Sequence, residues 1–235
     1  MKEHQHINAN SGIGIRESIL MITVALYIAI DLTCDVTAHR YVSFFSMTLI
    51  GSSLIYPLTY CINDAVAELF GYKHARTMIW LGIMADFIFS FLIIGINKLP
   101  SPEFWTLKQS FIDVLDPMLR LNIGGFFGII AGRFVGIYVI SKTKILYQGR
   151  FYLIRSMIAT AVGICAHSIV LDVITFYGVV PSKNFYSIML TNYLSNFSSA
   201  VLLFWIPAII VTVIKSRYKI DTFDRQVNYN PFSLK

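Results

Sequence analysis

The sequence predicts an all-α, polytopic membrane protein in which six transmembrane helices form one bundle, with both termini in the cytoplasm. Hydrophobic residues make up 56% and charged residues 14% of the 235 residues, and the mean hydropathy is +0.64. The chain also contains apolar runs of membrane length, with basic residues gathered in alternate connections. This composition excludes a soluble enzyme, a secreted disulfide scaffold and a disordered chain.

Six apolar runs qualify as spans, because each is long enough to cross a bilayer and is bounded by polar or basic residues. They cover residues 18–37, 43–63, 75–97, 119–141, 155–180 and 187–214. Residues 1–17 lack the charge and cleavage order of a signal peptide, so they remain as an N-terminal cytoplasmic tail before the transmembrane domain 18–214. Residues 215–235 form a basic, solvated C-terminal tail. The connection 98–119 is either an interfacial capping segment or a plain loop.

The distribution of basic residues predicts the orientation. When the connections are assigned to alternate sides, thirteen of the nineteen Lys and Arg residues fall on one side, five on the other, and Arg133 within a span. The richer side is expected to face the cytoplasm. The net charge of +6 is therefore a topology signal and does not indicate nucleic acid as a partner.

No motif of an enzyme is present. The sequence contains no phosphate-binding glycine loop, no zinc-protease motif and no nucleophile–histidine–acid order with supporting context. The three cysteines fall inside apolar runs without the close spacing of a metal site. We therefore expect neither catalysis nor a bound metal or cofactor.

The main functional signal is a set of acidic residues within or at the ends of the spans. A charge at the centre of a bilayer costs about 2.5–3.5 kcal/mol, so such a residue normally faces the bundle interior, finds a partner or marks a pathway. Six of the thirteen acids are placed this way: Asp31, Asp35, Asp64, Glu68, Asp86 and Asp172.

The densest polar cluster lies in residues 56–76. Asp64 and Glu68 are four residues apart and share one helical face. They either bind a cationic or hydrogen-bond-donating ligand or pair with Lys73 and Arg76. Asp31 and Asp35 repeat this spacing near the outer end of the first span, where they form either a site or a solvated mouth.

Asp86 lies near the middle of its span and needs an inward partner. Arg133 is the obvious candidate, either as half of an internal ion pair or as a contact to substrate. Its helix carries Gly124, Gly128, Gly132 and Gly136, a ridge that favours close helix packing. His167 and Asp172 lie about 140° apart on one helix, so they do not form one site by themselves, although His167 could shuttle protons. Together, Asp86, Arg133, His167 and Asp172 are candidates for a proton or charge relay.

A polar stripe on the last span completes the candidate residues. Asn192, Ser195, Asn196 and Ser199 share one face. The amides suit hydrogen bonds either between helices or to the edge of a nucleobase. The stripe indicates a polar cavity, because four polar groups facing lipid would be unfavourable.

Residues 56–76 resemble the vitamin uptake transporter family, also called the queuosine precursor transporter family. The resemblance lies in the run Tyr56-Pro57-Leu58-Thr59-Tyr60, followed by Asp64, Glu68, Gly71, Lys73 and Arg76. It extends more loosely over most of residues 18–214. It implies an inner-membrane importer of a 7-deazaguanine precursor of queuosine, such as preQ0 or preQ1. Family members often have further acids near positions where this chain has Gly136 and His167.

The sequence thus predicts a small-molecule importer, with proton coupling as an extension. Asp64, Glu68, Asn192 and Asn196, with Thr59, are the expected substrate-binding residues, and aromatic rings would stack on the base. One alternative is the substrate-binding subunit of an energy-coupling-factor transporter, which needs a partner ATPase module. Another is a non-transporting membrane scaffold. The choice among preQ0, preQ1 and queuine stays open, as do the coupling ion and the oligomeric state, for which a homo-oligomer is one option.

Overall fold

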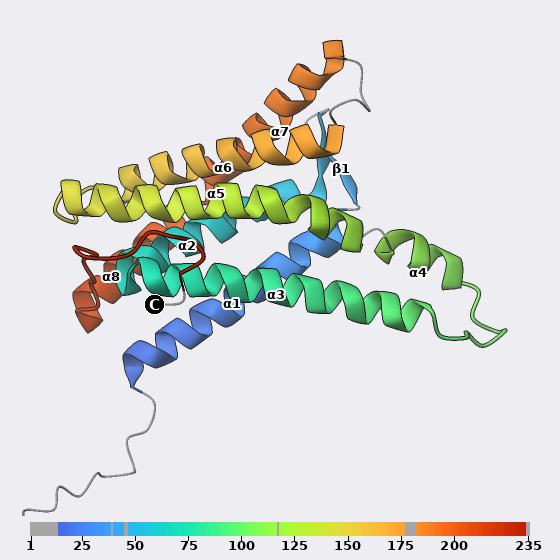
Figure 1. Cartoon of the computed structure of the whole chain (residues 1–235), viewed down its shortest axis with the longest axis horizontal. Coiled ribbons are helices and arrows are strands. Elements are labelled where there is room, and N and C mark those ends of the chain that lie inside the picture. The colour runs from blue at the N-terminus through green and yellow to red at the C-terminus, as the bar shows by residue number, and fades with distance from the viewer. Residues whose placement is uncertain (1–13, 39, 45–46, 117, 177–181, 234–235) are drawn as a thin grey trace, which may run out of the picture.

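The computed structural model describes residues 14–38, 40–44, 47–116, 118–176 and 182–233 of the chain (Figure 1). The elements in chain order are α1 (Ile15–Thr37), β1 (Tyr41–Phe44), β2 (Met47–Ile50), the 3-10 helix η1 (Gly51–Leu54), α2 (Tyr56–Phe70), α3 (Tyr72–Asn97), α4 (Lys108–Leu115), α5 (Met118–Leu146), α6 (Tyr152–Phe176), α7 (Ser182–Leu203) and α8 (Trp205–Tyr218). The long helices run side by side, as expected for a polytopic membrane protein.

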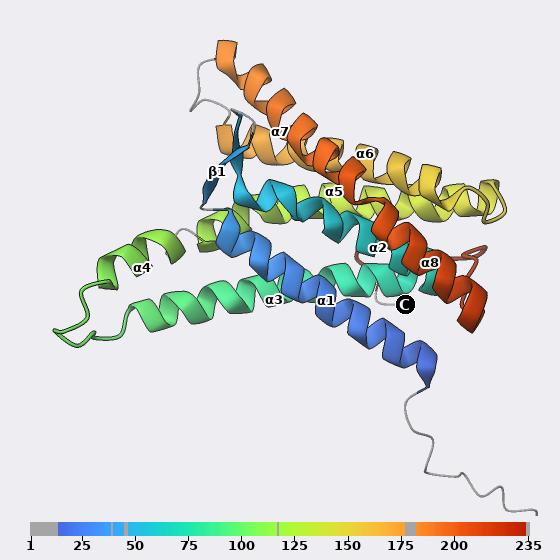
Figure 2. The same cartoon turned by 180° about the vertical axis from the view of Figure 1, so that it is seen from behind.

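Four of the described helices are long and apolar enough to cross a membrane. They are Ile15–Thr37, Tyr72–Asn97, Asn122–Leu146 and Tyr152–Ile174. α7 and α8 make a fifth candidate span if they are taken together across a 43° bend (Figure 2). The chain is therefore a mainly helical, multi-pass membrane protein. The placement of both termini in the cytoplasm stays a prediction.

The second predicted span, residues 43–63, is not one helix. Its first part forms the antiparallel hairpin β1–β2, in which Tyr41 pairs with Ile50 and Phe44 with Met47, so the fold is not purely α-helical. The turn-prone stretch Gly51–Leu54 follows as η1, and a new helix begins at Tyr56 with Pro57 in its first turn. Proline is favoured there because the first amides of a helix have no partner within the helix. Apolarity alone did not reveal this break.

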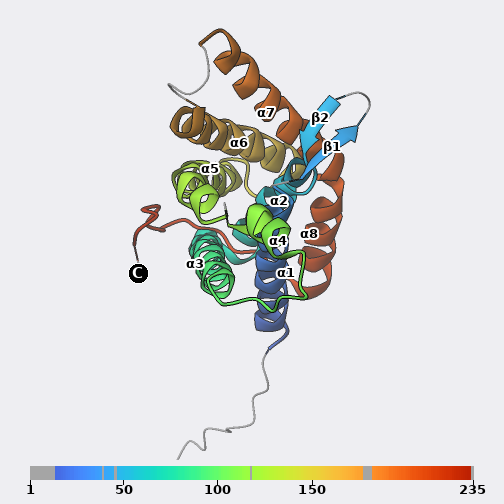
Figure 3. The same cartoon turned by 90° about the vertical axis from the view of Figure 1, so that its right-hand side faces the viewer.

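Helix α2 is the centre of the bundle. It has 15 residues, and buried side chains occur on all of its faces. Figure 3, which looks along the bundle, shows the longer helices arranged around it. Aliphatic and aromatic residues of α2 pack into the main core with residues of α1, α3 and α5. Polar groups on α2 are consequently shielded from lipid and must find partners inside the protein.

Two of the four glycines of the predicted α5 ridge, Gly128 and Gly132, pack closely, whereas a Cβ at Gly124 would meet nothing within 4 Å. A Cβ atom at Gly132 would lie 2.7 Å from the carbonyl oxygen of Gly163 in α6 and 2.5 Å from the Tyr60 hydroxyl of α2. At Gly128 a Cβ would lie 3.0 Å from His167 of α6. The small residues therefore allow the three helices to approach one another.

The C-terminal tail, residues 219–233, folds back onto the bundle, which differs from the predicted solvated tail. The Asp224 carboxylate accepts a hydrogen bond from the Tyr72 amide at 2.7 Å. Trp80 of α3 donates its indole N–H to the Pro231 carbonyl at 2.9 Å. Arg76 donates to the carbonyls of Asn228 and Asn230 at 3.3 and 3.0 Å. These contacts satisfy polar groups at the start of α3, so the tail is part of the fold.

Gly71, at the junction of α2 and α3, has φ 94° and ψ 166°, a conformation that is available essentially only to glycine. A Cβ atom there would also lie 2.7 Å from Oδ1 of Asp224. We expect Gly71→Ala to destabilise the protein by about 1–3 kcal/mol. Thermal unfolding of the purified protein in detergent measures this change.

The matched control is Gly95→Ala in α3, where a Cβ would meet nothing within 4 Å. Because alanine favours a helix over glycine, this variant should be neutral or slightly stabilised. Equal unfolding temperatures for the two variants would contradict the role of the backbone at Gly71.

Candidate functional site

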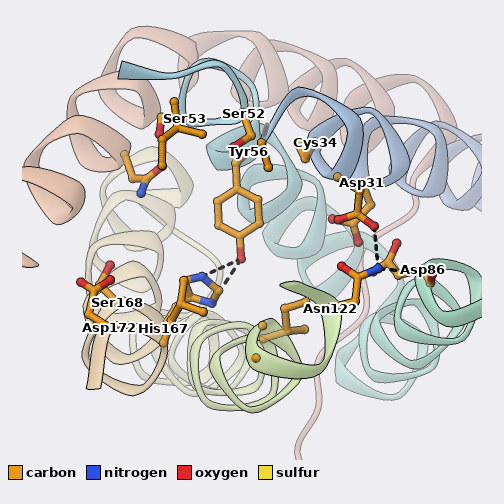
Figure 4. A pocket seen from close by; sticks show the side chains of 18 of the residues that line it. Asp31, Cys34, Ser52, Ser53, Tyr56, Asp86, Asn122, His167, Ser168 and Asp172 are labelled. Carbon is orange, nitrogen blue, oxygen red and sulfur yellow. Dashed lines mark hydrogen bonds between the residues drawn. The ribbon is translucent and has the colours of Figure 1, made fainter. Parts of the chain in front are cut away.

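A cavity of about 600 Å³ lies between β2, η1 and the helices α1, α2, α3, α5, α6 and α7, and its lining combines apolar surface with polar side chains (Figure 4). Its lining residues come from the end of the bundle that contains the hairpin, the start of α5 and the end of α6 (Figure 1). The volume falls within the range of about 300–1,000 Å³ that is usual for small-molecule sites. The lining polar and ionisable side chains are Asp31, Cys34, Asp35, Ser52, Ser53, Tyr56, Asp86, Asn122, His167, Ser168, Asp172 and Asn196.

One wall of the cavity contains a buried ion pair. Arg133 donates to both oxygens of Asp31, at 2.7 and 2.5 Å, and also to the Tyr27 hydroxyl. The Arg133 side chain is fully buried, and its guanidinium lies 5.5 Å from the centre of the Tyr56 ring. Such a two-pronged geometry compensates both charges away from water. This pair joins α1 to α5 beside the cavity.

Asp86 is therefore not the partner of Arg133, in contrast to the pairing favoured from the sequence. Both Asp31 and Asp86 lie within their spans, and sequence position alone does not tell which one Arg133 can reach. The structure shows that α1 supplies the carboxylate that takes both guanidinium N–H groups.

Asp86 and Asp35 lie beside this ion pair without a basic partner of their own among the described contacts. Asn122 donates from Nδ2 to Asp35 Oδ2 at 2.9 Å, and the same nitrogen lies 2.9 Å from Ser90 Oγ and 3.3 Å from the Asp86 carbonyl. Asp86 is 4% exposed, and its Oδ1 atom has no hydrogen-bond partner in the described part of the chain. This wall thus has unused acceptor capacity.

The facing wall presents groups of mixed hydrogen-bonding character. The Tyr56 hydroxyl lies 3.3 Å from Nδ1 and 3.4 Å from Nε2 of His167, and the two rings are 5.2 Å apart. Ser168 and Asp172 follow on α6, and Asn196 of α7 completes the wall. Figure 4 shows Tyr56 standing between this wall and the acidic one. An aromatic ring is thereby placed within reach of polar groups on both sides.

The opposite end of α2 is closed by a network of charges that we call the Glu68 cluster, formed by Glu68, Lys144, Arg155, Lys215 and Asp221. Arg155 donates to both oxygens of the fully buried Glu68, at 3.0 and 2.8 Å, and Lys215 donates at 2.5 Å. Lys144 donates to the Glu68 carbonyl and to Asp221, each at 2.5 Å. The cluster joins α2, α5, α6, α8 and the tail.

Asp221 is the most exposed acid of the Glu68 cluster. Partial burial alone raises the pKa of its carboxyl, but hydrogen bonds from Lys144 and Lys215 hold that pKa below its ordinary value. Asp221 therefore remains ionised as the second acid of a cluster with three basic groups.

The structure separates the expected binding residues. Asn196 lines the cavity, whereas Thr59, Asp64 and Glu68 are buried on α2 and are not among its lining residues. Asp64 accepts hydrogen bonds from Ser156 at 2.6 Å and Thr160 at 3.1 Å, and Thr59 donates to the Tyr56 carbonyl.

Two further expectations meet different outcomes. The alternative pairing of the α2 acids with Lys73 and Arg76 is wrong for Glu68, since its basic partners come from α5, α6 and α8. Asn192 lies in α7, but its side chain is outside the described residues. Of the expected relay residues, Asp86, His167 and Asp172 line the cavity, and Arg133 lies next to it in the ion pair with Asp31.

Comparison with known proteins assigns the chain to a family. Residues 50–211, more than half of the chain, match the model of the family described as "Putative vitamin uptake transporter". The chain belongs to this family. No curated protein and no solved structure gives a significant match. Membership in the vitamin uptake transporter family indicates a membrane transporter of vitamin-like substrates and suggests a non-enzymatic protein.

Some of the cavity residues of this vitamin uptake transporter were missed from the sequence. The sequence marks Tyr56 only as part of a motif, and Asn122 gives a weak signal because it is a single amide near the start of a span. Ser52 and Ser53 fall inside the predicted continuous second span. The signal for Ser52, Ser53 and Tyr56 lies in the turn-forming and proline residues at positions 51–57, which indicate an interrupted span.

Proposed function

We propose that this transporter imports a 7-deazaguanine precursor of queuosine, preQ0 or preQ1, across the cytoplasmic (inner) membrane, coupled to protons. The observation that carries the proposal is the cavity of about 600 Å³, in which a tyrosine ring stands between two groups of hydrogen-bonding side chains. The family match supports transport of a vitamin-like compound. The choice of a deazapurine rests on the resemblance of residues 56–76.

The chemistry of the cavity suits a flat, polar heterocycle. A 7-deazaguanine base carries N–H donors and a carbonyl acceptor on its edges and two π faces. Asn196 offers both an amide donor and an acceptor, Asp172 and Asp35 offer acceptors, and Tyr56 offers a ring. Buried polar groups of this kind discriminate strongly against a ligand that leaves them unpaired.

The position of the cavity supports an outward-facing state. The cavity reaches α2 at Tyr56, near the start of the helix, whereas the Glu68 cluster binds Glu68 near its end. The positive-inside pattern puts the basic Glu68 cluster on the cytoplasmic side. Substrate would then enter the cavity from outside, and release would require the cluster to open. Thr59, Asp64 and Glu68 would meet the substrate only after such a change.

Transport by the purified chain alone is the direct test. Proteoliposomes loaded with unlabelled preQ0 are placed in labelled preQ0, and exchange is followed. We expect exchange by the unmodified protein, a clear loss of affinity for Tyr56→Leu and a smaller loss for Tyr56→Phe, which keeps the ring. Stacking of a base on an aromatic ring contributes about 1–3 kcal/mol, so Tyr56→Leu should weaken binding by roughly 5- to 150-fold.

Ser198→Ala on α7 is the matched control, because Ser198 is exposed and does not line the cavity. Equal affinity of the Tyr56→Leu and control proteins would refute the stacking role. Exchange that appears only with a co-purified ATPase would favour an energy-coupling-factor subunit. Absence of exchange with preQ0, preQ1 and queuine, together with a stable protein partner, would favour a scaffold.

A further inference from the structure

The charges beside the cavity do not balance. Asp31, Asp35 and Asp86 are three carboxylates on two neighbouring helices, and Arg133 is the guanidinium that faces them. The two-pronged contact with Asp31 uses both terminal nitrogens of Arg133. Arg133 thus neutralises Asp31, whereas the nearby Asp35 and Asp86 have no basic partner of their own among the described contacts. Two carboxylates this close within a membrane span repel each other unless a proton or another cation lies between them.

Asp86 is the member of the pair with an open position. Its side chain is 96% buried, as its exposed fraction is 4%, and Oδ1 has no hydrogen-bond partner among the described residues. It contributes to the large cavity and also to a second cavity of about 10 Å³, which Asn122 lines as well. A void of this size holds about one water molecule. The small void beside Asp86 is too small for an organic ammonium group but has room for a proton on the carboxyl group.

The surrounding donors argue against a metal cation. A sodium ion needs several oxygen atoms directed at it. Here a carboxylate oxygen of Asp35, the hydroxyl of Ser90 and the backbone carbonyl of Asp86 all lie within hydrogen-bond distance of the Asn122 amide nitrogen. These oxygens are directed at an N–H donor and not at a metal ion. A carboxyl proton on Asp86 meets no such conflict. Asn122 reaches Asp86 only at its backbone carbonyl, and Asp86 itself is one of the residues that line the cavity.

We propose that Asp86 is the site of the coupling proton, which it takes up from the cavity that it lines. The outside solution supplies the proton, which binds a carboxylate oxygen of Asp86, accompanies the substrate, and is released to the inside when Asp86 ionises again. The charged groups that face Asp86 are Asp31 and Asp35 from α1 and Arg133 from α5, with Tyr27 and Cys34 of α1 as further titratable neighbours. This inference rests on the proposed import function.

The test separates movement of substrate from its coupling to protons. Purified protein in liposomes receives labelled preQ0, whose neutral side chain adds no titrating amine. Exchange is measured at equal pH on both sides, and accumulation is measured with the outside about two pH units more acidic. With one proton per substrate, that difference supports up to about a hundredfold accumulation, since each pH unit corresponds to a factor of ten.

We expect Asp86→Asn to retain exchange of preQ0 at equal pH, with an altered affinity because Asp86 lines the cavity, but to lose accumulation driven by the pH difference. Asp86→Glu should retain accumulation with a shifted pH dependence. Asp113→Asn is the control, because Asp113 is an exposed acid on α4 that is not among the cavity-lining residues. It should retain both activities.

Undiminished accumulation by Asp86→Asn would overturn the assignment, as would accumulation by the unmodified protein that follows a sodium gradient and ignores the pH difference. If Asp86→Asn does not fold, Asp86→Glu decides: an unchanged pH dependence overturns the proposal, and a shifted one supports it. Failure of the unmodified protein to exchange preQ0 would instead refute the import function itself.

Discussion

Arg133→Met is expected to lower the free energy of unfolding by about 3–5 kcal/mol, because it removes one partner of a buried ion pair. The change leaves Asp31 buried beside Asp35 and Asp86 with no guanidinium to compensate it. It also removes the donor to the Tyr27 hydroxyl. Thermal unfolding of the detergent-purified protein, followed by the loss of its monodisperse peak in size-exclusion chromatography, measures the effect.

The double variant Asp31→Leu/Arg133→Met gives this prediction its sharpest control. Replacing both charges by apolar side chains of similar size is often tolerated, so the double variant should be more stable than Arg133→Met alone. Arg40→Gln changes an exposed arginine and should shift stability by at most about 0.5 kcal/mol. A double variant less stable than the single one would show that Asp31 does not depend on Arg133.

Glu68→Gln, at the end of α2 far from the cavity, is expected to lower the free energy of unfolding by a similar amount. The fully buried carboxylate binds Arg155 and Lys215 directly and lies 3.8 Å from Lys144. Without it, these three cations face one another with Asp221 as the remaining acid of the cluster. We expect a loss of about 3–5 kcal/mol, measured by the same thermal assay.

Asp64→Asn is the matched control for Glu68→Gln, since it changes another buried acid on the same helix. Its hydrogen-bond partners, Ser156 and Thr160, are neutral hydroxyls that can also donate to an amide oxygen. Asp64→Asn should therefore lower the free energy of unfolding by a smaller amount, about 1 kcal/mol or less. An Asp64→Asn protein that is less stable than Glu68→Gln would contradict the ionic role assigned to Glu68.

The sequence predicted the class of the protein, a helical membrane protein, but it did not predict where a span is interrupted or which side chains pair. Spans with uniform apolar runs, such as α1 and α3, were found because hydropathy and length suffice to identify them. The close packing of α5 at Gly128 and Gly132 also followed from spacing, since small residues four apart form one face, but it does not extend to Gly124. The interrupted second span was missed because an apolar hairpin has the same hydropathy as a helix.

Side-chain partners within the membrane could not be derived in the same way. The four-residue spacing of Asp64 and Glu68 correctly suggested one face, but their partners lie 76 to 147 residues away in the chain. Spacing within one helix says nothing about which helices surround it. The same limit explains why Arg133 was matched to Asp86, although Asp31 on another helix takes its hydrogen bonds.

The docked C-terminal tail has a consequence for biosynthesis. Asp224 binds the amide of Tyr72, 152 residues earlier, and Lys215 binds Glu68 across 147 residues. Because the ribosome delivers the chain from the N-terminus, the first half of the bundle enters the bilayer before either contact exists. The charges around Glu68 must stay hydrated or otherwise shielded until residues 215–224 have been made. Closure of that end of the bundle is thus a late step of folding, because it waits for these residues.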